Sequence, residues 1–401
     1  MRSLIHSPVG IASQPTKTYR PDEASSRLRS ILELPRTTKP QSNVNRSQSR
    51  VPNHQHISFL DVPQSSTTNN HIFSDRTHNQ LQLAIRNSWA DSTLKGYSRT
   101  VRHFLKFCDR EAVPSHLRFP ADEFILCAYA ASDAGCTSGN TIQNRMSALK
   151  AWHHTHNVSW QGGMRLHIVL NGVKNLTPVT SIRPLRPPVT KSMINALISG
   201  LNLESPVDVA VAACATTAFW GQCRLGELLA SSNSDLTTSQ RPARSHLTRG
   251  RKSTTFTLLL PQTKTHRQGE SVIIAAQDCP SNPLPLLQHH LSINNLTQDF
   301  PLFTYSSPSG PTVLTKGLFL ARCNDVWSAF GYPKTTGHSF RIGGTTELLL
   351  SGVPPDVVKK MGRWASDSFL RYWRNLEDIA PLHMRNNDQH RKHRKRHTRT
   401  Y

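Results

Sequence analysis

The sequence predicts a mainly α-helical protein with a small β-sheet, organised as an all-helical domain followed by a second, mixed domain. Three observations lead to this fold class. Apolar residues recur every three or four positions in most segments after residue 79, as amphipathic helices require. Only two short stretches alternate apolar and polar residues as strands do. A proline-dense, aperiodic stretch at 177–188 separates the two groups and is predicted to be a linker.

Both ends of the chain differ in composition from the middle. Residues 1–78 hold seven prolines and no tryptophan or cysteine, whereas all seven tryptophans lie at Trp89 or later. A segment with so little apolar surface cannot offset its ordering entropy, so a disordered Ser/Thr/Pro-rich tail is predicted. Residues 385–401 form a short basic tail with seven Lys or Arg and one Asp.

The first folded domain is predicted to span 79–176. Its helices are expected at Asp91–Arg110, Ala121–Asp133, Ser138–His156 and Met164–Val173. Asp91 or Ser92 could cap the first of them. In the third, Ile142 and Met146 lie on the predicted buried face, while Arg145, Lys150, His153 and His154 form a predicted basic side.

The second domain is predicted to span 189–384. Two strands at Thr254–Leu260 and Ser271–Ala275 flank a polar turn, which together predict a β-hairpin. Helices are expected at Lys191–Gly200, Pro206–Phe219, Thr315–Phe330, Ser339–Ser351, Pro354–Met361 and Ser366–Arg374.

The charge of the chain indicates its partner. The formal net charge is +23 and the sequence pI is about 10.3, which favours nucleic acid or an anionic membrane surface. No apolar run approaches the roughly 18–20 residues that span a bilayer, and the N-terminus lacks a secretory apolar stretch. The tails hold a surplus of five and of six positive charges, which leaves twelve for the folded region. We therefore expect an intracellular protein that binds double-stranded DNA, with Arg145 and Lys150 among its contacts.

Cysteine and histidine patterns do not predict a metal site. The seven cysteines form no C-x-x-C pair and their number is odd, so neither a zinc site nor a disulfide framework is expected. The neighbouring histidines of His153-His154-x-His156 and His289-His290 lack cysteine partners, and we expect them to face solvent or phosphate.

His338 and Arg341 are the first pair with a clear chemical use. They stand three residues apart in Gly-His-Ser-Phe-Arg-Ile-Gly-Gly, so on a helix they share a face and can meet one phosphate. Arginine suits this task because its planar fork donates two parallel hydrogen bonds. With Gly362-Arg363-Trp364 and Tyr372 downstream, this segment resembles the catalytic end of the tyrosine recombinase (phage integrase) family.

The resemblance extends upstream to two further elements. The family has an early arginine in an Arg-x-x-Glu/Asp element after an apolar helix, and Arg224 matches it, with Glu227 as the supporting residue. The family's lysine lies on the turn of a β-hairpin, where Lys264 matches, while Lys252 is a weaker candidate. The resemblance thus implies six catalytic residues in order along the chain: Arg224, Lys264, His338, Arg341, Trp364 and Tyr372.

One spacing departs from the usual pattern of the family. Tyr372 follows Trp364, which replaces the histidine of many relatives, after eight residues instead of nine. On a helix one residue is a rotation of about 100°, so the turn at 365–367 is expected to be one residue tighter.

The resemblance implies a core-binding (SAM-like) helical domain and a catalytic domain that grip duplex DNA. Tyr372 would attack the scissile phosphate and form a 3′-phosphotyrosyl bond, and no cofactor, metal, membrane or small-molecule substrate is implied. It also implies a homotetramer on two DNA sites. The wording Gly-Arg-Trp-x-Ser-Asp-x-Phe-Leu-x-Tyr resembles recombinases of eukaryotic mobile elements, so a nuclear location is expected.

Two alternatives stay open from the sequence. A DNA-binding remnant of a mobile element would have the same motifs but no activity. A type IB topoisomerase would use related chemistry to relax DNA, although its members do not usually show His-x-x-Arg.

Overall fold

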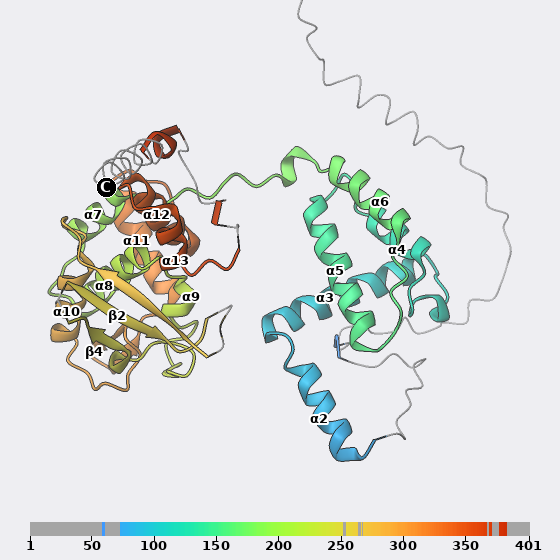
Figure 1. Cartoon of the computed structure of the whole chain (residues 1–401), viewed down its shortest axis with the longest axis horizontal. Coiled ribbons are helices and arrows are strands. Elements are labelled where there is room, and N and C mark those ends of the chain that lie inside the picture. The colour runs from blue at the N-terminus through green and yellow to red at the C-terminus, as the bar shows by residue number, and fades with distance from the viewer. Residues whose placement is uncertain are drawn as a thin grey trace, which may run out of the picture. The chain divides into compact units, whose positions relative to one another are not determined.

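The computed structural model describes residues 58–60, 73–251, 254–263, 266, 268–366, 369–370 and 377–382. The chain divides into two compact units, 1–182 and 183–401, and the division falls within the predicted linker 177–188. Among the described residues most elements are helices, accompanied by one three-stranded and one two-stranded sheet (Figure 1). The predicted mainly α class with a small sheet is confirmed.

The first unit consists of helices. They are α2 (Asp75–Arg86), α3 (Asp91–Arg110), α4 (Glu123–Ala131), α5 (Gly139–Thr155) and α6 (Met164–Asn175), with short 3-10 turns at Ser115–Leu117 and Val179–Ser181. Polar side chains cap several of these helices. At the start of α5, for example, the Ser138 side chain accepts a hydrogen bond from the backbone amide of Thr141. The start of α3 has no side-chain cap, so neither Asp91 nor Ser92 caps it as predicted.

Order in this unit begins earlier than the predicted boundary at 79. Helix α2 starts at Asp75, and Phe59 is fully buried although it lies in the segment predicted to be disordered. The Phe59 ring packs 5.5 Å from Trp89 and 5.1 Å from Tyr97, centroid to centroid, and its amide donates to the hydroxyl of Ser98. A single aromatic residue in a polar segment has no periodicity, which is why the sequence pattern missed it.

His153 also departs from the prediction, because it lies in the core and not on a basic side of α5. Its Nε2 accepts from the backbone amide of Ala121 at 2.9 Å, so its Nδ1 carries the proton and donates to the carbonyl of Leu149. Burial lowers the pKa of His153, which is consistent with a neutral ring that serves as a hydrogen-bonding core residue.

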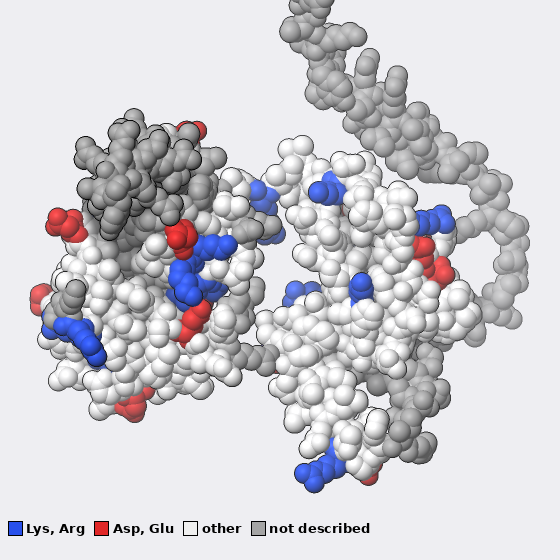
Figure 2. All heavy atoms as spheres, in the orientation of Figure 1, with Lys and Arg blue, Asp and Glu red and all other residues white. Residues whose placement is uncertain are grey.

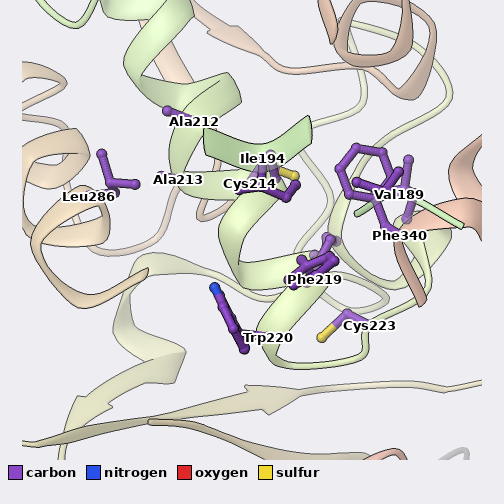
Figure 3. Packing of buried hydrophobic residues seen from close by; sticks show 14 of the residues in the cluster. Val189, Ile194, Ala212, Ala213, Cys214, Phe219, Trp220, Cys223, Leu286 and Phe340 are labelled. Carbon is purple, nitrogen blue, oxygen red and sulfur yellow. The ribbon is translucent and has the colours of Figure 1, made fainter. Parts of the chain in front are cut away.

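The second unit is built around α8. Its helices are α7 (Lys191–Gly200), α8 (Pro206–Trp220), α9 (Leu225–Leu228), α10 (Pro283–Ile293), α11 (Lys316–Ala329), α12 (Gly337–Leu350) and α13 (Pro355–Met361), with a 3-10 turn at Arg244–His246. Helix α8 is buried along almost its whole length. Phe219, Trp220 and Cys223 pack with Val189 and Phe340 in this core (Figure 3).

Two glycines of α12 allow close approach to neighbouring backbone. A Cβ atom on Gly344 would lie 1.9 Å from the carbonyl oxygen of Phe219 in α8, and one on Gly343 would lie 1.8 Å from that of Val189, which precedes α7. Only glycine fits at these positions. Gly344 therefore sets how close α12 comes to α8, and Gly343 sets how close it comes to the segment before α7.

A three-stranded antiparallel sheet has the order β1 (Leu247–Arg249), β2 (Thr255–Leu260), β3 (Glu270–Ala275). Phe256, Leu258 and Leu260 point from β2 into the core. The β2–β3 pairing runs from Thr255 opposite Ala275 to Leu260 opposite Glu270. A second hairpin joins β4 (Thr304–Ser307) to β5 (Gly310–Val313).

The end of the chain is described only in part. The predicted helix Ser366–Arg374 lies largely outside the described residues, while Phe369 and Ile379 are buried in the core of the second unit. Within the described part of the chain, no helix is both long and apolar enough to cross a membrane.

Candidate active site

Arg224 begins the site at the turn that follows α8. Gln222 has a φ of 48°, which turns the chain sharply, and Arg224 then occupies the N-cap of α9. The Glu227 carboxylate accepts from the backbone amide of Arg224 at 2.9 Å and from its Nη1 at 2.6 Å. The Arg224 side chain keeps 26% of its surface exposed. The Arg-x-x-Glu element therefore forms one rigid unit with its guanidinium reaching solvent.

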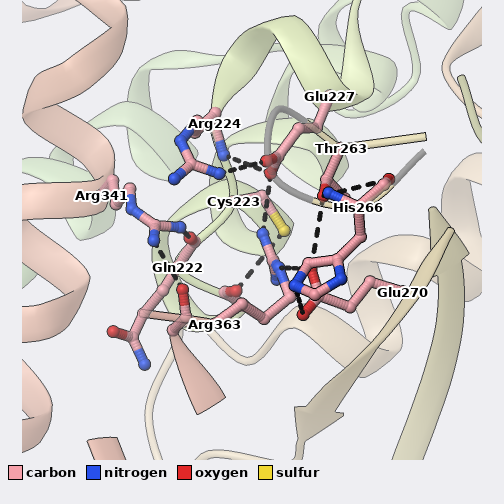
Figure 4. A network of polar contacts seen from close by, with 11 residues as sticks. Gln222, Cys223, Arg224, Glu227, Thr263, His266, Glu270, Arg341 and Arg363 are labelled. Atoms are coloured by element: carbon pink, nitrogen blue, oxygen red, sulfur yellow. Dashed lines mark hydrogen bonds and ion pairs between the residues drawn. The ribbon is translucent and has the colours of Figure 1, made fainter. Parts of the chain in front are cut away.

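Arg341 lies on α12, one turn after His338. It is fully buried, and its guanidinium donates to the carbonyl oxygens of Gln222 and Gly362. Burial lowers the pKa of Arg341 to about 10, helped by the positive charges of Arg224 and Arg363. Arg341 thus joins the turn after α8 to the turn after α13 (Figure 4).

The ring of Trp364 packs against the guanidinium group of Arg341. The guanidinium carbon of Arg341 lies 3.9 Å from the centre of the Trp364 ring, a cation–π contact. A Cβ atom on Gly362 would lie 2.2 Å from Trp364 Nε1. Residue 362 therefore has to be glycine, because any side chain there would clash with the indole of Trp364, which packs against this turn.

His338 is half-buried beside these arginines. Burial lowers its pKa below the usual 6.5, and the charges of Arg186, Arg341 and Arg224 lower it further. Its imidazole is therefore neutral at pH 7 and able to accept a proton. Arg186 comes from the predicted linker and was not anticipated as a neighbour of the site.

Arg363 is the central residue that the sequence pattern did not identify as functional. Its φ is 57°, a left-handed conformation uncommon for arginine, and its side chain is 3% exposed. Its Nη2 donates to Glu227 at 2.7 Å, and its Nε lies 3.6 Å from Glu270. Arg363 is part of the motif Gly-Arg-Trp, but the motif does not reveal its partners. Glu227 and Glu270 lie 136 and 93 positions away along the chain.

The hairpin turn between β2 and β3 lies next to Arg363. Glu270 begins β3, and its carboxylate oxygens lie 3.4 Å from Thr263 Oγ1 and 3.8 Å from His266 Nε2. The amide of Thr263 donates to the carbonyl of His266 at 2.9 Å. Figure 4 shows Thr263, His266 and Glu270 beside Arg363. Lys264 directly follows Thr263 in the chain and lies outside the described residues.

The predicted nucleophile Tyr372 also lies outside the described residues, as does Asp367 of the predicted tighter turn. The structure brings together Arg224, Glu227, His338, Arg341 and Trp364 from three separate segments. On the same unit, Figure 2 shows Lys and Arg side chains gathered with Asp and Glu side chains. The positive groups of the site are thus partly compensated before any ligand binds.

The helical unit carries a separate basic surface. Of the two predicted contacts, Lys150 is exposed, whereas Arg145 is partly buried and its guanidinium pairs with Asp133. Helix α3 contains five Lys or Arg residues, and the first four follow one another at spacings of four, three and four, which places them on one face. This set, called here the α3 stripe, is Lys95, Arg99, Arg102 and Lys106.

The described residues contain no group of three or more side chains that could hold a metal ion. Six of the seven cysteines are wholly or partly buried, and none forms a disulfide. His290, one of the two adjacent histidines, is buried. Its Nε2 donates to the carbonyl of Leu302, and its Nδ1 accepts from the side-chain amide of Asn294. It does not face solvent or phosphate as predicted.

The fold resembles that of recombinases and integrases. XerH site-specific recombinase bound to palindromic difH substrate in a post-cleavage complex shares 15% identity at a TM-score of 0.49, over 82% of this chain and 93% of that one. Tn1549 transposon integrase in complex with transposon right end DNA shares 15% sequence identity at a TM-score of 0.48. The match covers 76% of this chain and 98% of that one. A lambda integrase dimer bound to a COC′ core site shares 14% sequence identity at a TM-score of 0.45, and the match covers 75% of this chain and 94% of that one.

No protein-family model matches the sequence, and no curated protein matches it. At these identities and scores, what the chain does has to be inferred from its own residues.

Proposed function

We propose that this protein is a tyrosine recombinase that breaks and rejoins DNA strands through a 3′-phosphotyrosyl intermediate. The observation that carries the proposal is the convergence of Arg224, Arg341, His338 and Trp364 from segments far apart in sequence. The Nε of Arg341 is a buried donor without an acceptor among the described residues. Buried donors are normally satisfied, so this one supports a site that receives an anion.

In the proposed reaction, Arg224 and Arg341 hold the non-bridging oxygens of the scissile phosphate as negative charge develops there. The phenol oxygen of Tyr372 attacks phosphorus, and the bond between phosphorus and the 5′ oxygen breaks. His338 accepts the phenol proton, and Lys264 donates a proton to the departing 5′ oxygen. The phosphodiester energy is conserved in the covalent bond, so neither ATP nor a metal ion is needed.

The proposed partner is double-stranded DNA. Exchange of strands between two DNA sites requires four protomers, two on each site. An origin in a eukaryotic mobile element and a nuclear location accord with the basic terminal tail.

The decisive experiment is a trap for the covalent intermediate. The full-length protein first selects the duplexes that it binds from a randomised library. Each selected sequence is then synthesised as a set of duplexes with a nick next to one phosphate at a time. After cleavage at that phosphate the short fragment diffuses away, and the covalent intermediate accumulates. We expect an adduct that survives denaturation, disappears in Tyr372→Phe, and persists in the matched control Tyr332→Phe.

Three outcomes would redirect the proposal. An adduct that persists in Tyr372→Phe would exclude this nucleophile. DNA binding without any adduct would favour the inactive remnant. An adduct accompanied by plasmid relaxation but no recombinant product would favour a topoisomerase.

A further inference from the structure

Gln222 is a fully buried glutamine in a backbone conformation that suits glycine better. Its φ of 48° lies in the left-handed region, which a residue with a Cβ atom adopts at a cost. Residues held in this region by their surroundings cluster at functional sites. We therefore looked for a task that the Gln222 side chain performs and that glycine could not.

The side chain of Gln222 contacts two helices of the site. Its Oε1 lies 2.8 Å from the hydroxyl of Thr345 in α12, and that hydroxyl lies 2.8 Å from the carbonyl oxygen of Arg341, one turn earlier. At the other end of the amide, Nε2 donates to the carbonyl of Val358 in α13 at 3.4 Å. Because Gln222 itself follows α8, one side chain connects three helices.

These contacts close a ring around the guanidinium of Arg341. Arg341 donates to the backbone carbonyls of Gln222 and Gly362 (Figure 4). The Gly362 amide donates at 2.9 Å to the Val358 carbonyl, which also accepts from Gln222 Nε2. The Gln222 side chain packs directly against Gly362, since a Cβ atom there would lie 2.7 Å from Gln222 Oε1. It therefore holds together the two turns whose carbonyls receive Arg341.

We propose that Gln222 is a positioning residue that fixes the guanidinium of Arg341 for the scissile phosphate. This inference rests on the proposed function and deepens it. The two carbonyls accept from Nη1 and Nη2 of Arg341, while its Nε is a buried donor without an acceptor among the described residues. Where that donor points depends on where the two carbonyls lie. Gln222 thus sets how Arg341 meets a phosphate oxygen.

A substrate without the charge that Arg341 neutralises separates positioning from folding. In a methylphosphonate, a methyl group replaces one non-bridging oxygen, so the group at phosphorus carries no negative charge. The same bonds form and break, between phosphorus and the phenol oxygen and between phosphorus and the 5′ oxygen. An arginine that neutralises the replaced oxygen is then no longer needed, and its exact position stops mattering. The two diastereomers of the methylphosphonate each replace a different oxygen.

The experiment measures single-turnover adduct formation by the full-length chain on nicked duplexes that carry the phosphate or either methylphosphonate diastereomer. Arg341→Met identifies the diastereomer on which Arg341 is dispensable. We expect Gln222→Gly, which suits the left-handed backbone, to slow the reaction of the phosphate by about 10-fold to 100-fold, as misplacement of a catalytic group by about 1 Å does. Thr345→Val removes one hydrogen bond and should slow it by about 5-fold. On the identified diastereomer, both variants should react at the rate of the wild type.

Thr216→Val is the matched control, because this buried hydroxyl of α8 donates to carbonyls of its own helix. It should leave all three rates unchanged, and thermal unfolding shows that each variant is folded. Equal loss on every substrate in the folded Gln222 and Thr345 variants, or failure of both diastereomers to rescue Arg341→Met, would overturn the positioning role alone. If the wild type forms no adduct on the phosphate duplex, the proposed function fails and this inference fails with it.

Discussion

Glu227 receives two guanidinium groups and a backbone amide, although the carboxylate is almost completely buried. Neutralising it would leave the buried charge of Arg363 with only the more distant Glu270. A buried charge without a partner is strongly unfavourable. Glu227 therefore stabilises the guanidinium groups of both Arg224 and Arg363, and Arg363 is the more deeply buried of the two.

His338 leads to a prediction about pH. Because the pKa of this imidazole lies below 6.5, the ring is neutral above that pH and takes up a proton only as the pH falls further. If it accepts the phenol proton, the rate of adduct formation should fall as the pH is lowered below 6.5. Single-turnover rates over this range test the expectation.

The matched variants for this prediction are His338→Gln and His154→Gln. The first cannot accept a proton, so its rate should be lower and should lose the dependence on pH below 6.5. The second replaces an exposed histidine of the helical unit and should keep the wild-type profile. An unchanged profile in His338→Gln would mean that another group accepts the proton.

At single positions, sequence reasoning selected its candidate catalytic residues by their type and spacing. Arg224, His338 and Arg341 follow from motif spacing, and the structure brings them together. Arg363 could not be assigned in that way, because its partners lie on α9 and β3 and its left-handed backbone is a tertiary property. His153 was misplaced because a histidine at a core position has no distinguishing pattern in one sequence.

At the scale of elements, the close approach of α12 to α8 and to the segment before α7 predicts which glycine can change. Gly343→Ala and Gly344→Ala each force a Cβ against a backbone carbonyl, at 1.8 and 1.9 Å. Overpacking typically costs about 1–3 kcal/mol, and rigid backbone neighbours place these variants at the upper end. Thermal unfolding of the second unit measures the effect.

Gly317→Ala is the control for helix propensity. This glycine lies near the start of α11, and the atom nearest to a Cβ there, Thr315 Oγ1, would be 3.9 Å away. Alanine should therefore be neutral or stabilising by up to about 1 kcal/mol. Equal melting temperatures for Gly317→Ala and Gly344→Ala would contradict the close approach of α12 to α8.

The α3 stripe predicts where the helical unit meets phosphate. Each phosphate contact removed should reduce the dependence of DNA affinity on salt by about one unit of slope. We expect Lys95→Gln and Lys106→Gln each to do so, weakening binding uniformly across sequences. Titrations at several salt concentrations measure the slope.

Arg165→Gln removes an exposed charge from α6 and should leave the slope unchanged. Lys150→Gln tests the original prediction on α5 in the same assay. If only Lys150→Gln lowers the slope, the DNA surface lies on α5 and the α3 stripe is a solvated helix face.

Long periodic elements were predicted well, and short or aperiodic ones were missed. Helices α3 and α7 match their predicted bounds, since each combines a clear apolar stripe with a defined start. Strands β1, β4 and β5 have three or four residues, too few to show alternation. Helix α10 begins Pro-Leu-Pro-Leu, a run that indicates loop until Asn282 is seen to cap it.

For the whole molecule, the excess positive charge is spread over both tails and the folded region. Such a distribution supports long-range attraction to DNA and a steep salt dependence, but it does not choose a site. In the proposed function, specific geometry comes from the two units acting on one duplex. Their connection through 177–188 then determines how strongly binding by one unit assists binding by the other.

Doubling this linker tests whether the units act together. A flexible Gly/Ser insertion after the exposed Pro184 lowers the effective concentration of the second unit, and each doubling of a flexible connection costs about 0.6 kcal/mol, or roughly threefold in affinity. We therefore expect the dissociation constant for the selected duplex, measured at fixed salt, to rise about threefold while adduct formation at saturating protein is retained. An unchanged constant would mean that one unit provides all the binding, because its affinity would not depend on where the other is tethered. Loss of adduct at saturation would instead show that the linker holds a fixed geometry, with Arg186 beside His338 as its anchor in the second unit.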